Sequence, residues 1–245
     1  MTIDRDVISA IRLELQGQSN EKTRTSFQRF FKEGITCYGV KSADVSQIAR
    51  RYFSQIKPLG KQEIWLLCEK LLQSDYSEET TIAFDWSYRL HNQYTRDDFA
   101  IFENWLRKYV NNWAKCDTLC NHAIGALVIR YPELIGNLKQ WTPSTNRWLR
   151  RGAAVTLIIP ARNGQFLKDI FDIADSLITD EDDMVQKGYG WLLKEASRKH
   201  QQEIFDYVMK HRAVMPRTAF RYAIELLPLD LKHRAMEKPK DHPAR

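Results

Sequence analysis

An aromatic ring and a carboxylate one helical turn apart are the residues in this sequence whose types and spacing most directly suggest chemistry. Trp113 and Asp117 stand four positions apart in the segment NNWAKCD, so a helix would place both on one face. Tryptophan prefers burial and aspartate prefers water, so the pairing needs an explanation. A carboxylate in this setting can stabilise a developing cation, or position a water molecule to attack one.

Structural roles for the same residues remain open at this point. On residue type alone, Asp117 could be a helix cap, or it could form an internal salt bridge with Lys115 or a neighbouring helix. Zinc binding by Cys116, Cys120 and His122 is disfavoured, because structural zinc sites use two clustered pairs of ligands. The sequence also has no glycine-rich phosphate loop. We therefore predict no metal and no cofactor.

A repeated pattern suggests how such residues are positioned. Three tryptophans are each followed three residues later by a cation: Trp105 by Lys108, Trp148 by Arg151, and Trp191 by Lys194. Successive tryptophans are 43 residues apart, which is typical of HEAT-like repeats with two helices per unit. Equivalent residues of stacked repeats share a surface, so the three cations are predicted to lie on one face. The spacing of such a line of charge suits a phosphate backbone.

The same pattern has a structural interpretation. A tryptophan at a repeat position usually packs between helices, and the cation that follows usually lies over it with its charged end in water. Acidic proteins compete with nucleic acid as the partner of a basic groove. The net charge of +6 is compatible with either polyanion.

Helical periodicity runs through nearly the whole chain, with roughly a dozen helices of about 10 to 18 residues expected. Only 10 glycines and 8 prolines interrupt 245 residues, too few for a sheet protein full of tight turns. Ser144 and Thr179 are candidate N-caps. The segment AVTLIIPARNGQF could form a strand and hairpin, but WLRRGAAV leads into it without a break, so we predict a helix. The fold class expected is all-α, an α-α superhelix of HEAT-like repeats.

Length and composition define the remaining expectations. We predict one repeat domain over residues 1–236 and a disordered tail over 237–245. The longest stretch without a formal charge, Thr118 to Ile129, has 12 residues and is too short to span a bilayer. We expect a cytoplasmic monomer whose four cysteines are reduced core thiols. They are Cys37, Cys68, Cys116 and Cys120.

Several segments, in order along the chain, resemble the AlkD-like DNA alkylation-repair family of HEAT-like repeat DNA glycosylases. They are YGVKSADVSQIAR (38–50), NWAKCD, NRWLRRGAAV, VQKGYGWLLKEASRKH (185–200) and MPRTAFRYAIELLP. The resemblance extends over roughly residues 25 to 227. It implies a basic concave groove for duplex DNA and release of purines alkylated at N3 or N7, without a deep pocket for the lesion and without a cofactor.

The resemblance also implies roles for individual residues. Asp117 would be the catalytic carboxylate, and Trp113 and Trp191 would pack on the sugar. The cation that holds the DNA backbone would be Arg151, assisted by Lys194 where the family often has arginine. Arg150 and Lys108 complete the predicted DNA-binding set. The alternative is a non-catalytic solenoid that binds damaged or branched DNA, or a protein-binding scaffold.

Overall fold

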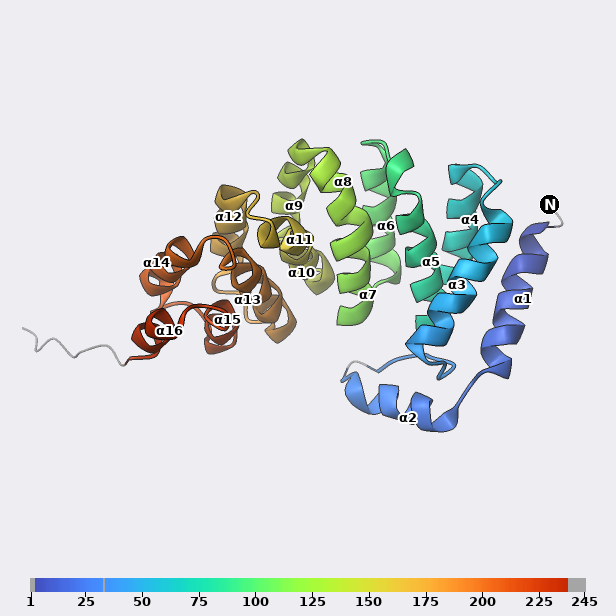
Figure 1. Ribbon diagram of the computed structural model, residues 1–245, viewed down its shortest axis with the longest axis horizontal. Coiled ribbons are helices and arrows are strands. Elements are labelled where there is room, and N and C mark those ends of the chain that lie inside the picture. Colours follow the sequence, from blue (N-terminus) through green and yellow to red (C-terminus); the bar gives the residue numbers. More distant parts are fainter. Residues whose placement is uncertain (1–2, 33, 238–245) are drawn as a thin grey trace, which may run out of the picture. The chain divides into compact units, whose positions relative to one another are not determined.

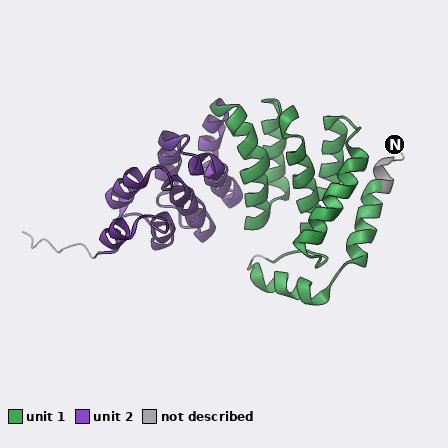
Figure 2. Ribbon diagram, in the orientation of Figure 1, with its two compact units in different colours: residues 1–132 green, residues 133–245 purple. Residues whose placement is uncertain are grey.

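The computed structural model describes residues 3–32 and 34–237 of the chain, and these residues form helices and connecting turns without a strand (Figure 1). This confirms the predicted all-α class of helical repeats. The helices group into two compact units, Met1–Pro132 and Glu133–Arg245 (Figure 2). Each unit has its own buried hydrophobic core, and the two are described separately.

Unit 1 consists of helix pairs in two layers. Its helices are α1 (Ile3–Gly17), α2 (Glu21–Phe30), α3 (Ser42–Ile56), α4 (Lys61–Leu72), α5 (Ser77–Arg89), α6 (Asp98–Tyr109), α7 (Trp113–Thr118) and α8 (Gly125–Arg130), with a π-helix (Leu119–Ile124) between the last two. In Figure 1, α3, α5 and α7 stand side by side in front of α4 and α6. Across the α3–α5 contact, the buried Trp86 indole Nε1 donates to the Ala49 carbonyl at 2.9 Å.

Unit 2 continues the same construction with shorter helices. They are α9 (Ile135–Trp141), α10 (Arg147–Val155), α11 (Ile158–Arg162), α12 (Leu167–Leu177), α13 (Asp183–Ala196), α14 (Gln201–His211), α15 (Arg217–Ala223) and α16 (Leu229–Met236). One layer contains α10, α13 and α15, and the other contains α9, α12, α14 and α16. The α13–α15 approach requires Gly190, because a Cβ there would lie 2.8 Å from the Tyr222 Cβ and 2.9 Å from the Ala219 carbonyl oxygen.

Helix boundaries differ from the sequence predictions in two respects. Several helices are shorter than the predicted 10 to 18 residues, among them α7 with 6 and α11 with 5. The predicted caps at Ser144 and Thr179 are wrong. Instead, the Asn146 side chain accepts from the Trp148 N–H at 2.9 Å, and the Asp182 carboxylate accepts from the Met184 N–H at 2.8 Å. Asparagine and aspartate are at least as effective N-caps as serine and threonine, so each loop runs on to the later residue.

Four further expectations concern a possible hairpin, the cysteines, the C-terminal tail and membrane spans. The segment AVTLIIPARNGQF is helical through α10 and α11, as predicted, and its Asn163-Gly164 pair forms the turn that follows. All four cysteines are buried. Apart from Glu237, the predicted disordered tail over 237–245 lies outside the described residues. No helix in the described part of the chain has the length and apolar character needed to cross a membrane.

Candidate catalytic and DNA-binding residues

The start of α7 is fixed by a cluster of polar side chains. The buried Asn112 caps the helix, its side-chain oxygen accepting from the Lys115 N–H at 3.0 Å. The Lys115 ammonium, also buried, lies 2.6 Å from a carboxylate oxygen of Asp75. Asn111 donates to the same oxygen at 2.8 Å. These contacts hold Trp113, the first residue of α7, at a defined position in unit 1.

Trp113 and Asp117 are both partly exposed on α7, although Lys115 and Cys116 between them are buried. The helix therefore keeps Trp113 and Asp117 partly accessible while its other face enters the core. Directly after α7 the chain forms the π-helix Leu119–Ile124. Such turns are rare and occur frequently at functional sites. Within this turn the Asn121 side-chain oxygen is buried without a hydrogen-bond partner among the described residues.

An aromatic cluster orients Trp113. Its ring stacks on Phe31, with centroids 5.3 Å apart and planes 14° apart. Phe30 meets the same ring edge-on at 5.7 Å and is 67% exposed. Beside them lies a cleft of about 280 Å³. It is lined by Phe27, Phe30, Phe31, Ile35, Val40, Ser42, Val45, Ser77, Glu78, Thr81 and Ala114. Phe30 and Phe31 are not among the residues predicted from the sequence, where their only signal is a run of phenylalanines at the end of a polar segment.

The YGVK segment, which follows Phe31 in the chain, is held in place by a buried carboxylate. The buried Glu78 carboxylate accepts from the backbone N–H groups of residues 38–40, at 2.8 to 3.1 Å. Gly39 has a φ of +85°, and a Cβ there would lie 2.5 Å from the Asn20 carbonyl oxygen. Only glycine fits that backbone. The YGVK segment, which is among those that resemble the family, thus has a structural role: its fixed backbone supports the chain that follows Phe31.

In unit 2, a buried carboxylate anchors Trp191. The indole Nε1 donates to Glu195 at 3.3 Å, and Glu195 is 3% exposed. Arg162 and Arg198 donate to its second oxygen at 2.9 and 2.6 Å. Burial acts to raise the pKa of Glu195, but these two guanidinium groups outweigh it and leave the pKa below its usual value. Trp191 itself is partly exposed, so its ring is fixed at one edge and accessible elsewhere.

The predicted cations of unit 2 make contacts within the unit. Arg150 forms an ion pair with Asp180 at 2.6 Å and donates to the Ser144 carbonyl at 2.8 Å. Arg151 is only 5% exposed, and its guanidinium donates to the Met184 carbonyl at the start of α13. Both arginines therefore connect α10 to the α12–α13 region.

Lys194 has a more accessible partner. Its ammonium lies 2.7 Å from the Glu225 carboxylate, whose side chain is 50% exposed. Lys194 and Arg151 belong to the same layer of unit 2, on α13 and α10.

The prediction that the 43-residue period marks equivalent positions in successive repeats is wrong. Trp105 and Trp148 are buried core residues, unlike Trp191. Trp105 and Lys108 lie on α6, the first helix of its pair, whereas the other two tryptophans lie on second helices. Lys108 accordingly stands in the layer of α4, with its ammonium 3.8 Å from Glu69, and not with α7.

The stacked helix pairs define this chain as a helical-repeat protein. It matches the family model of DNA alkylation repair enzymes over residues 11–227, and it belongs to that family. A solved structure described as a predicted DNA alkylation repair enzyme from Enterococcus faecalis has the same fold. The TM-score is 0.78 at 16% identity, covering 86% of this chain and 98% of that one. No curated protein matches.

Among the described residues, no three His, Cys, Asp or Glu side chains cluster in a way that could hold a metal ion. In particular, His122 is exposed and lies beside the Tyr88 ring, with centroids 5.2 Å apart, while Cys116 and Cys120 are buried.

Proposed function

We propose that this protein is a DNA glycosylase that hydrolyses the N-glycosidic bond of cationic N3- or N7-alkylated purines in duplex DNA. The observation that carries the proposal is the partial exposure of both Trp113 and Asp117 on one short helix whose other side is buried. Membership of the DNA alkylation repair family supports DNA as the substrate.

The chemistry follows from the charge of the lesion. Alkylation at N3 or N7 makes the purine positively charged and therefore a better leaving group. Cleavage of its glycosidic bond builds positive charge on the deoxyribose, as in other glycoside hydrolyses. The Asp117 carboxylate opposes that charge and orients the attacking water. The face of Trp113 not covered by Phe31 packs on the sugar, because aromatic faces attract partial positive charge.

The remaining predicted residues bind the DNA. Trp191 contacts the sugar, with its indole held by Glu195. Lys194 can exchange its partly exposed partner Glu225 for a phosphate, although a lysine lacks the bidentate geometry of arginine. Arg151 acts from a nearly buried position, and Arg150 and Lys108 add positive charge. The reaction as proposed uses no metal or cofactor.

The test is single-turnover release of N7-methylguanine and N3-methyladenine from methylated duplex DNA, scored by chromatography. Asp117→Asn keeps the shape but removes the charge, and we expect a loss of somewhat less than about 10²–10³ in rate, because the lesion supplies part of the driving force. Duplex binding should be unchanged or slightly tighter. Uracil, a neutral base, should not be released, because the mechanism needs a leaving group that is already cationic.

The matched control is Asp97→Asn, which neutralises an exposed aspartate of unit 1 that makes no capping hydrogen bond. Its rate should equal that of the wild type. Equal rates for wild type and Asp117→Asn would remove Asp117 from the mechanism. If neither protein released a base, the non-catalytic DNA-binding alternative would replace the proposal.

A further inference from the structure

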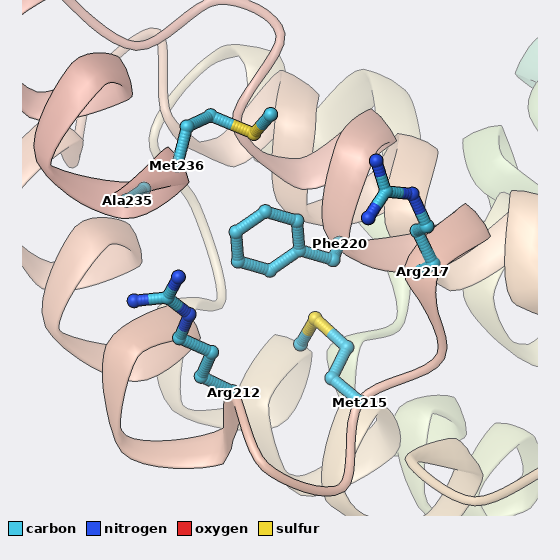
Figure 3. A pocket seen from close by; sticks show the side chains of 6 residues that line it. All are labelled: Arg212, Met215, Arg217, Phe220, Ala235 and Met236. Carbon is cyan, nitrogen blue, oxygen red and sulfur yellow. The ribbon is translucent and has the colours of Figure 1, made fainter. Parts of the chain in front are cut away.

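A second, separate pocket lies within unit 2 among α14, α15 and α16. Its volume is about 200 Å³, below the roughly 300–1,000 Å³ of sites for drug-sized ligands. The residues that line it are Arg212, Met215, Arg217, Phe220, Ala235 and Met236. Figure 3 shows the Phe220 ring at the centre, with the two arginine side chains on opposite sides of it. The pocket therefore suits one small group with a flat apolar part.

The two guanidinium groups face this pocket without a carboxylate among its lining residues. Arg217 makes no hydrogen bond or ion pair within the described part of the chain, and Arg212 donates only to the Glu237 backbone carbonyl there. Several other arginines of unit 2 are matched with acids, as in the Arg147–Asp182 pair at 2.7 Å. Uncompensated guanidinium groups favour an anionic ligand, for which carboxylate and phosphate are the usual choices.

The apolar residues of the lining indicate which of these two kinds of anion the pocket would bind. Met215 is nearly buried, Phe220 is partly exposed and Met236 is 45% exposed. A partly exposed aromatic ring that lines a pocket offers a stacking surface to a planar group, and nucleic-acid bases stack on such rings irrespective of sequence. An acidic peptide would use the arginines but would leave the Phe220 ring without a planar partner. The combination of phosphate and base is the ligand that uses both parts.

The pocket is connected to the proposed DNA-binding face by one helix. On α15, Ala219 and Tyr222 pack against Gly190 of α13, which immediately precedes Trp191. Arg217 and Phe220, at other positions of the same helical turn, line the pocket formed with α14 and α16 instead. A DNA strand bound at Trp191 would thus need to pass only one helix to reach it.

We propose that this pocket binds one unpaired nucleotide of a DNA strand, with its base against Phe220 and the phosphates on its two sides at Arg212 and Arg217. The inference takes DNA as the ligand from the proposed function, but it does not depend on base excision. It predicts an affinity for short single strands that resides in α14–α16.

The experiment measures binding of a fluorescent, 5′-phosphorylated thymidine tetranucleotide to the full-length protein by anisotropy. A second probe has the same backbone with abasic sugars. Arg217→Ala should weaken binding of both probes at least about fivefold, and should lower the log–log salt slope by about 0.7. Phe220→Leu should weaken only the thymidine probe by a similar factor, because it removes the stacking surface and leaves the cations. Thermal unfolding of each variant checks that it is folded.

Arg221→Ala is the matched control, since Arg221 is an exposed arginine on α15 that does not line the pocket. It should change binding by less than about twofold, as expected of a non-specific surface charge. Equal effects of Arg217→Ala and Arg221→Ala would overturn the proposal, as would equal effects of Phe220→Leu on the two probes. If an acidic tetrapeptide bound more tightly than the tetranucleotide, the proposed nucleotide ligand would be replaced by an acidic segment of a protein partner. Wild-type protein that binds the tetranucleotide but releases no methylpurine would count against the glycosylase proposal alone.

Discussion

At the scale of single residues, the environment of each side chain decides what it can contribute. Asp117 and Trp113 are partly exposed on a helix with a buried opposite face, and in the proposed mechanism this carboxylate acts on charge that develops in the substrate. Arg150, in contrast, is bound to Asp180 and to a loop carbonyl within its own unit. Its contribution to DNA binding would be long-range charge, which is weaker than a direct phosphate contact in salt solution.

Lys194 gives the clearest prediction for a single DNA contact. Lys194→Ala should weaken duplex binding and lower the magnitude of the log–log salt slope by about 0.9, the contribution of one phosphate contact. Lys194→Arg should bind at least as tightly as wild type, because a guanidinium can hold phosphate through two donors. Titrations at several salt concentrations measure both. Lys187→Ala on the same helix, where the lysine is paired with Asp183, is the control and should leave the slope unchanged.

At the scale of elements, the end of α2 supports a residue of α7. Phe31 and Trp113 are far apart in the sequence, and their stacked rings connect the two helices. The Glu78 carboxylate in turn holds the backbone of residues 38–40. The position of the Trp113 ring therefore depends on a loop and a buried acid that do not themselves face a substrate.

Phe31→Leu should separate stacking from packing in this cluster. Leucine keeps an apolar side chain but removes the ring that orients Trp113, and an aromatic pair is worth about 0.5–1.5 kcal/mol. We expect base release to slow by up to about tenfold, with duplex affinity nearly unchanged. Single-turnover rates and anisotropy titrations measure this difference. Phe27→Leu, in the same cleft, is the control, and an equal loss in that variant would show that the cleft matters rather than the stacked ring.

The carboxylate that anchors Trp191 predicts a pH dependence of stability. The pKa of Glu195 is lowered in the folded state, so its ionised form stabilises the fold above its unfolded pKa of about 4.3. That contribution is lost as the pH falls through the lower folded pKa. Wild type should therefore exceed Glu195→Gln in stability near pH 7, and the difference should shrink towards pH 3. Urea unfolding across this range tests the sign, and a constant difference would contradict it.

At the scale of the whole molecule, charge is the property that bears on function most directly. The chain has a net charge of +6, and a protein that neutralises phosphates releases counterions. If all four predicted cations contact phosphates, duplex affinity should fall with salt at a log–log slope of up to about −3.6.

Arg151→Ala should weaken binding and flatten that slope. Because Arg151 also donates to the Met184 carbonyl, unfolding of the variant must be measured alongside binding. Duplex binding that does not respond to salt would favour a protein-binding scaffold over a DNA-binding protein.

Much of this protein is determined by local sequence. Helical periodicity predicts the all-α class, and the residues before Trp113 include Asn112, a residue type that caps helices and does so here. The four-residue spacing of Trp113 and Asp117 is sufficient to place them together on α7. These features depend on backbone geometry and short-range hydrogen bonds, which a few neighbouring residues control.

Only the tertiary structure distinguishes residues with the same local pattern. Trp105, Trp148 and Trp191 share one motif and one period, yet the first two are buried and the third is partly exposed. The stacking of Phe31 on Trp113 and the anchoring of Trp191 by Glu195 with Arg162 likewise depend on which helices meet. Burial and partner choice arise from packing between distant segments, and the spacing of residues along one helix contains no information about the helix that will cover it.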